Sequence, residues 1–175
     1  YLIASKNHHA IHSPFVFDLV TNVIYENIST NTTSKIELLR SNLCKDNNFI
    51  NVKDFGAGSN INKKKKRKIK DIAKNSSKNK KFGKLLYRIV KHFKPKEIFE
   101  LGTSFGISTL YLSKANLKSN ITTFEGCEES AKIALDNFKK LDCANINTII
   151  GEFGETFSKK LAEKNKVNMV FIDGN

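Results

Sequence analysis

The sequence EIFELGTSFGISTLYL, residues 97–112, is followed after a short spacer by ITTFE, residues 121–125. Ile98, Phe99 and Leu101 suit a buried strand of a parallel sheet, in which both faces are covered. The following residues are typical of a glycine turn and a helix, and the second segment reads as another strand that ends in an acid. This order predicts a pocket for an adenosine-containing cofactor where the two strands end.

The turn itself contains Gly102 and Gly106, which have no Cβ and let the backbone turn tightly and approach a ligand. The helix that continues from Ser108 directs its free N–H groups back at this turn. Glu125 follows about 20 residues later, the interval at which nucleotide-binding folds place an acid that binds a ribose. The spacing therefore predicts a cofactor site built from the turn and Glu125.

The type of cofactor is indicated by two other residues. Dinucleotide folds prefer G-x-G-x-x-G, whose middle glycine makes room for a pyrophosphate. Ser104 stands in that place here, and Glu100 lies two residues before the first glycine. A carboxylate at this position would repel a pyrophosphate but suits a ligand that carries an ammonium group. The residues therefore disfavour an oxidoreductase with a nucleotide cofactor.

The run ELGTSFGIST, residues 100–109, resembles motif I of class I S-adenosylmethionine (SAM) dependent methyltransferases, in the version of the catechol and caffeoyl-CoA O-methyltransferase group. FGKLL at 82–86, GEF at 151–153 and VNMVFIDGN at 167–175 extend the resemblance. It implies an α/β fold with a Rossmann-like parallel sheet, helices on both faces and preceding N-terminal helices. It also implies a SAM-dependent methyltransferase.

The resemblance further implies a set of cofactor-binding residues around the turn and at the strand ends. They are Gly83, Glu100, Gly102, Thr103, Ser104, Gly106, Ser108, Glu125, Gly126, Glu152 and Phe153. Glu125 would accept hydrogen bonds from two ribose hydroxyls, and Glu100 would hold the amino group through water or backbone. Ser104 and Ser108 would meet the methionine carboxylate. The alternatives are structural: a strand-end acid, a helix-capping acid, and plain turn and N-cap serines.

Asp173, at the end of the last strand, is the candidate catalytic residue. In the metal-dependent members of the resembled group, the acid at this strand end ligates a divalent cation, which lowers the pKa of a bound hydroxyl. The further oxygen ligands of such a site would come from beyond the fifth strand. Amino-methylating enzymes of nucleic acids usually carry an NPPY-like run here, whereas residues 171–175 read FIDGN. This favours oxygen on a small molecule as the methyl acceptor.

Composition and charge limit the other classes of protein to which the sequence could belong. The 175 residues suffice for one domain with a core, and no apolar run approaches the length of a membrane span. Three cysteines, without paired spacing, argue against a disulfide framework or a zinc cluster and fit a reducing cytoplasm.

The net charge of +13 attracts polyanions and is concentrated in Lys63–Lys68. No aromatic residue interrupts this run, so we expect a solvated loop or a basic helix over residues 63–75. The alternative function is a basic nucleic-acid-binding or RNA-modifying protein on a methyltransferase fold.

The patterning divides the chain at about residue 80. Residues 1–80 form a helical and loop extension with the basic run, and residues 81–175 form part of a SAM-binding, Rossmann-like domain. A helix is expected to begin at Ser13-Pro14, and DFGAGS at 54–59 is read as a structural glycine turn rather than the cofactor loop. The later helices and strands alternate, as in βαβ units, over residues 82–93, 97–101, 106–116, 121–125, 128–141, 146–150, 154–165 and 167–173.

Only four strands of the seven in this class are expected, so we interpret the sequence as truncated at its C-terminal side. Val167–Ile172 should then be an edge strand that pairs with Ile98–Leu101. Its apolar side chains carry none of the charges or prolines that protect natural edges. We therefore expect this edge to pair with another chain, as in a homodimer, or with the N-terminal segment.

Overall fold

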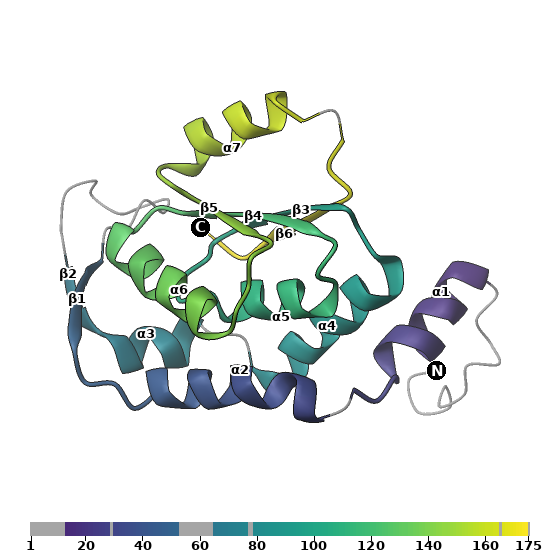
Figure 1. The fold of residues 1–175 in the computed structure, drawn as a ribbon, viewed down its shortest axis with the longest axis horizontal. Coiled ribbons are helices and arrows are strands. Elements are labelled where there is room, and N and C mark those ends of the chain that lie inside the picture. Colours follow the sequence, from purple (N-terminus) through teal and green to yellow (C-terminus); the bar gives the residue numbers. More distant parts are fainter. Residues whose placement is uncertain (1–12, 29, 53–64, 77–78, 165, 175) are drawn as a thin grey trace, which may run out of the picture.

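A computed structural model describes residues 13–28, 30–52, 65–76, 79–164 and 166–174. A parallel sheet of four strands lies at its centre, in the order β5-β4-β3-β6 (Figure 1). The strands are β3 (Glu97–Leu101), β4 (Asn120–Glu125), β5 (Ile146–Ile150) and β6 (Met169–Ile172). The α/β fold class and the Rossmann-like sheet expected from the sequence are confirmed.

Strand β3 is central because parallel neighbours flank it on both sides. It pairs with β4 in the register Ile98↔Ile121 and with β6 in the register Ile98↔Met169. The last four residues of β3 are buried. Strand β6 begins two residues later than expected, and β3 is its one strand neighbour within the part of the chain that the structure describes.

Helices cover the two faces of the sheet unequally. Helix α7 (Phe153–Ala162) lies on one face, and α4 (Lys80–Phe93), α5 (Ile107–Ala115) and α6 (Glu128–Lys140) lie on the other (Figure 1). Phe157 of α7 meets Phe99 and Phe124 edge-on, with ring centroids 6.0 Å and 5.7 Å apart. Such edge-to-face contacts add to the apolar burial that holds α7 on the sheet.

The helix ends follow local sequence signals. Helix α1 (Pro14–Leu19) begins as predicted, with the Ser13 side chain accepting a hydrogen bond from the Val16 N–H. It continues without a gap into a π-helical turn, η2 (Val20–Ile24). The Asn79 side chain caps the start of helix α4. The helix ends at Phe93, and its C-cap residue Lys94 has a φ of 47° and is followed by Pro95, which cannot continue a helix. None of the helices in the described ranges has the length and apolar character that a membrane crossing needs.

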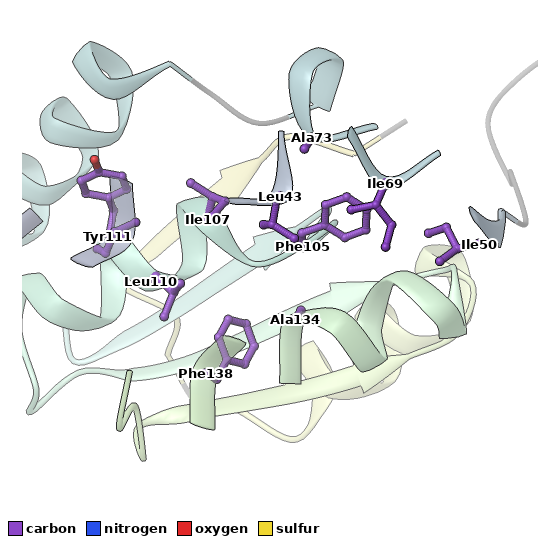
Figure 2. Packing of buried hydrophobic residues seen from close by; sticks show 11 residues of the cluster. Leu43, Ile50, Ile69, Ala73, Phe105, Ile107, Leu110, Tyr111, Ala134 and Phe138 are labelled. Carbon is purple, nitrogen blue, oxygen red and sulfur yellow. The ribbon is translucent and has the colours of Figure 1, made fainter. Parts of the chain in front are cut away.

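The N-terminal elements share a core with the sheet domain. Helix α2 (Thr30–Leu43), strand β1 (Phe49–Val52) and helix α3 (Ile69–Ser76) pack against α5 and α6. The cluster that joins them, drawn in Figure 2, contains Ile36, Leu43, Ile50, Ile69, Ala73, Phe105, Ile107, Leu110, Tyr111, Ala134 and Phe138. The division at residue 80 remains a prediction, but the two parts are packed through one continuous apolar cluster.

The expected basic helix over residues 63–75 is wrong for Lys65–Lys68, and residues 63–64 lie outside the described residues. Lys65–Lys68 forms strand β2, which pairs antiparallel with β1 in the register Phe49↔Lys68, and α3 begins only at Ile69. The short apolar strand β1 supplies backbone partners, and the Ile69 N–H donates to the Asn48 carbonyl, with N and O 2.9 Å apart. Pairing with β1 thus overrides the helical reading. The DFGAGS segment lies outside the described residues.

Gly83 provides a test of the α4–α5 contact. A Cβ built on Gly83 would lie 2.3 Å from the ring of Tyr111, a residue of α5 that is 1% exposed. Overpacking of this kind costs about 1–3 kcal/mol, whereas removing a helical glycine gains at most about 1 kcal/mol. We therefore expect Gly83→Ala to lower the free energy of unfolding, measured by urea denaturation.

Gly154 is the matched control. It lies in the first turn of α7, and a Cβ there would meet no atom within 4 Å. Gly154→Ala should be neutral or stabilising by up to about 1 kcal/mol. Equal effects of the two substitutions would contradict the close packing of Gly83 on Tyr111.

Candidate cofactor site at the ends of the strands

The predicted turn leaves β3 between the ends of β4 and β6. The backbone N–H groups of Gly102 and Thr103 both donate to the Phe124 carbonyl, with N and O 3.0 Å and 3.1 Å apart. Gly102 has a φ of 100°, and a Cβ on it would lie 2.6 Å from the backbone nitrogen of Gly174. The turn therefore requires glycine at its first position for two reasons, the backbone conformation and the approach of another chain segment.

The rest of the turn is held in a similarly tight conformation. Gly106 has a φ of 81°, and a Cβ on it would lie 2.4 Å from the ring of Phe138. Ser104 adopts a φ of 49° although it is not a glycine. Such left-handed positions cost on the order of 1 kcal/mol for a residue with a side chain, so a compensating interaction is expected.

Glu125 supplies that interaction from the end of β4. One oxygen of its carboxylate, Oε2, accepts from the Ser104 N–H at 2.7 Å, and the other, Oε1, accepts from the Cys127 N–H at 2.9 Å. Burial raises the pKa of Glu125, and the backbone N–H groups of Cys127, Ser104 and Gly126 oppose that rise. The carboxylate thus reaches the glycine turn, as a ribose-binding acid must, and also fixes the turn's shape.

Glu100 is fully buried between β3 and α5. Its Oε2 accepts from the hydroxyls of Thr109, at 2.5 Å, and Thr123, at 2.7 Å, while Oε1 has no hydrogen-bond partner. Burial raises the pKa of Glu100 to about 7; nearby hydroxyls lower it and the charge of Asp173 raises it. The pKa of Glu100 in the folded protein thus lies above its ordinary value of 4.5. Protonation of Glu100 therefore contributes its full share to the free energy of unfolding below pH 4.5, and this contribution is lost as the pH rises through about 7.

A chain of hydroxyls connects Glu100 to the turn. The Oγ1 atoms of Thr103 and Thr123 lie 2.6 Å apart, and Thr123 in turn donates to Glu100. Thr109 and Thr123 were not among the predicted site residues. A signal for Thr123 exists in the sheet register, because it lies directly opposite Glu100 on β4. Seeing it from the sequence requires the strand alignment to be known first.

The other predicted residues lie at neighbouring strand ends. The Asp173 N–H donates to the Leu101 carbonyl, with N and O 2.8 Å apart, so Asp173 follows β6 beside the turn. Phe153 begins α7, and its ring lies 2.5 Å from the position of a Cβ on Gly174. Glu152 is the exposed N-cap residue of α7. The structure thus gathers the turn, Glu100, Glu125, Phe153 and Asp173 at one end of the sheet.

Three other predicted positions have structural roles next to the turn or on α4. Ser108 is buried in the first turn of α5, where its hydroxyl helps to stabilise the charged form of Glu100 and so lowers its pKa. Gly126 follows Glu125, and its backbone N–H opposes the rise in the pKa of that carboxyl. Gly83 has a packing role against Tyr111, and its proposed contact with the cofactor remains a prediction.

Two carboxylates of the site suit a SAM-type cofactor. The buried, unpartnered Oε1 of Glu100 suits an ammonium group, and Glu125 offers carboxylate oxygens at the turn. No group of three or more His, Cys, Asp or Glu residues that could hold a metal occurs among the described residues. The expected metal contact of Asp173 therefore gains no further ligand from this structure and remains a prediction.

No family model matches the chain, and no curated protein matches it in sequence. Its fold, however, is shared with solved methyltransferases. The S-adenosylhomocysteine-bound methyltransferase PaMTH1 of Podospora anserina superposes with a TM-score of 0.60 at 18% identity, over 94% of this chain and 60% of that one. An O-methyltransferase of Bacillus cereus in complex with S-adenosylhomocysteine gives a TM-score of 0.56 at 19% identity, over 91% and 60%.

A third solved structure agrees over a shorter region. The O-methyltransferase TomG of Streptomyces achromogenes, involved in tomaymycin synthesis and solved with SAM, has a TM-score of 0.51 at 22% identity over 58% of this chain and 47% of that one. The chain therefore has the fold of class I SAM-dependent O-methyltransferases. It spans about half to three fifths of the length of these structures.

The hydroxyl chain below the turn can be tested with Thr123→Val. This change removes the partner of the Thr103 hydroxyl, which is buried, and one donor to Glu100. An unsatisfied buried polar group costs about 1–3 kcal/mol, so the free energy of unfolding should fall by that amount. Chemical denaturation at pH 7 measures the loss.

Thr148→Val is the matched control on the neighbouring strand. Thr148 lies opposite Thr123 in the sheet, and its buried Oγ1 has no hydrogen-bond partner. Replacing that hydroxyl with a methyl group should be neutral or stabilising. If both variants lost the same stability, the hydroxyl chain would have no special role.

Proposed function

We propose that this chain forms the cofactor-binding part of a SAM-dependent methyltransferase that methylates oxygen on a small molecule. The observation that carries the proposal is the position of Glu125, whose carboxylate lies 2.7 Å from the Ser104 nitrogen in the glycine turn. A ribose at this place could bond to Glu125 while the rest of the cofactor lies along the turn. The shared fold supports the same cofactor.

The proposed roles of the residues follow from their chemistry. SAM, when bound, supplies a methyl group on a positively charged sulfur. Glu125 binds the ribose hydroxyls, and Glu100 balances the ammonium group of the methionine part. Phe153, beside Gly174, shields the strand ends from water. These residues position the cofactor, and catalysis of methyl transfer relies mainly on such positioning.

Asp173 is proposed to act on the acceptor. It lies at the same end of the sheet as the turn, and its backbone is fixed to Leu101 of β3. A carboxylate here can accept a proton from the acceptor hydroxyl as the methyl group transfers. The proposal that the acceptor is a small molecule rests on the run FIDGN and on the O-methyltransferases that share the fold.

The ribose role can be tested with Glu125→Ala. The change removes a charged acceptor, so binding of S-adenosylhomocysteine should weaken by roughly 1.5–3 kcal/mol, the worth of hydrogen bonds to a charged group. Isothermal titration calorimetry measures this loss. Glu128→Gln is the control, because Glu128 is exposed at the start of α6 and pairs with Lys132. Unchanged affinity of a folded Glu125→Ala variant would contradict the ribose role.

The role of Glu100 predicts a pH dependence. The pKa of Glu100 is about 7 in the protein without a bound cation. An ammonium group beside the carboxyl would favour its charged form and so lower this pKa. Binding should therefore release a proton below pH 7, and the affinity for S-adenosylhomocysteine should rise from pH 5.5 to about 7. Calorimetry in buffers of different ionisation enthalpy counts the released protons.

The variant Glu100→Gln separates this effect from other titrations. It keeps an acceptor for Thr109 and Thr123 but cannot ionise. Its affinity should be lower near pH 7 and should vary less with pH. A variant that kept the wild-type pH profile would show that Glu100 does not face the ammonium group.

A further inference from the structure

A basic pocket lies between the β1–β2 hairpin and helix α3. These elements are at the left side of Figure 1. Its volume is about 400 Å³. We call it the hairpin pocket, and it is lined by Phe49, Lys66, Arg67, Lys68, Asp71, Ile72 and Asn75. None of these residues takes part in the proposed cofactor site.

The hairpin supplies the aromatic ring that the lysine run lacks in sequence. The register of the two strands places Phe49 opposite Lys68, and the Lys68 ammonium lies 5.4 Å from the centre of the Phe49 ring. Phe49 is nevertheless 58% exposed. The ring therefore keeps surface on which another flat group can stack.

The charge of the pocket is strongly positive. Lys66, Arg67 and Lys68 contribute three cations against the single carboxylate of Asp71. Within the described part of the chain, no ion pair neutralises these three side chains. The pocket therefore attracts an anion, and its aromatic ring attracts a ligand with a flat ring.

We propose that the hairpin pocket binds one nucleotide of a single-stranded nucleic acid. The base stacks on Phe49, and the flanking phosphates lie against Lys66, Arg67 and Lys68. Asn75 and Asp71 offer an amide and a carboxylate to the edge of the base. A single strand fits because its bases are free to stack on an aromatic side chain, whereas those of a duplex are not. This inference goes beyond the proposed methyl transfer and does not depend on it.

Strand β1, which forms one side of the pocket, is hydrogen-bonded to the residues that follow Glu125. The Asn51 N–H and side-chain amide both donate to the Glu129 carboxylate at 2.7 Å, and the Cys127 thiol donates to the Asn51 carbonyl at 3.5 Å. Cys127 in turn donates its N–H to Glu125. Strand β1, which carries Phe49 at its start, is thus hydrogen-bonded at Asn51 to the segment that follows Glu125.

The experiment measures binding of a fluorescently labelled 12-nucleotide single strand by anisotropy over a range of salt concentrations. Phe49→Ala should weaken binding about fivefold or more, because stacking on an aromatic side chain contributes strongly per base. Phe49→Tyr, which keeps the ring, should bind as the wild type does. The triple variant Lys66→Gln, Arg67→Gln, Lys68→Gln should lower the slope of log affinity against log salt by about two, since each contact with a single-strand phosphate contributes about 0.7.

The matched control removes the same charge elsewhere, by Lys118→Gln, Lys139→Gln and Lys159→Gln on exposed positions. This variant should keep most of the affinity. Thermal unfolding and S-adenosylhomocysteine binding show that each variant is folded and that the two sites are independent.

Three outcomes would overturn the proposal. Equal losses in the two triple variants, with no effect of Phe49→Ala, would show attraction by the overall charge alone. Competition by inorganic polyphosphate as strong as that by an unlabelled oligonucleotide would show that no base is recognised. Competition by adenosine monophosphate at the same concentration of nucleotide units would show a site for free nucleotides instead of a strand.

Discussion

Backbone crowding at Gly102 is the constraint on which the rest of the site depends. Strand β3 ends there between two neighbours, and no side chain fits between Gly102 and Gly174. The next residue, Thr103, shares the Phe124 carbonyl with Gly102, so the turn is attached to β4 as soon as it begins. The positions of Ser104 and Asp173 follow from this one junction.

Two acids, one fully buried and one partly buried, serve this junction in different ways. Glu125 is partly accessible and accepts backbone N–H groups, which oppose the rise that burial causes in its pKa, so its carboxyl can meet the hydroxyls of a ligand. Glu100 has two hydroxyl donors on one oxygen and none on the other, and burial holds its pKa near neutrality. A cation brought to Glu100 would therefore replace a proton at pH values below about 7.

The sheet and its helices could be predicted because their signals are local. Apolar strands with a glycine turn define β3 and β4, and Ser13-Pro14 defines the start of α1. The lysine run could not be assigned locally, since consecutive cations show neither helical nor strand periodicity. Its strand forms because Phe49–Val52 lies beside it in space.

In the candidate site, too, the residues with a local sequence signal could be predicted, and those that depend on contacts between distant elements could not. Motif spacing identified Glu100, the turn and Glu125, which the structure brings together. The hydroxyls of Thr109 and Thr123 were missed because their role depends on the strand register and on the packing of α5. The packing role of Gly83 likewise depends on Tyr111, which lies on another helix.

Helices α1 and α5 differ greatly in how they are attached. Helix α1 contains no buried residue, and it meets α4 through the Asp18–His92 pair and the stacked rings of Phe15 and Phe93. Seven of the nine residues of α5 are buried. Local opening of α1 thus costs little free energy, while α5 can open only with the whole fold. In a hydrogen-exchange experiment, the amide hydrogens of α1 would exchange before those of α5, and the exchange rates of α5 would report the global stability of the protein.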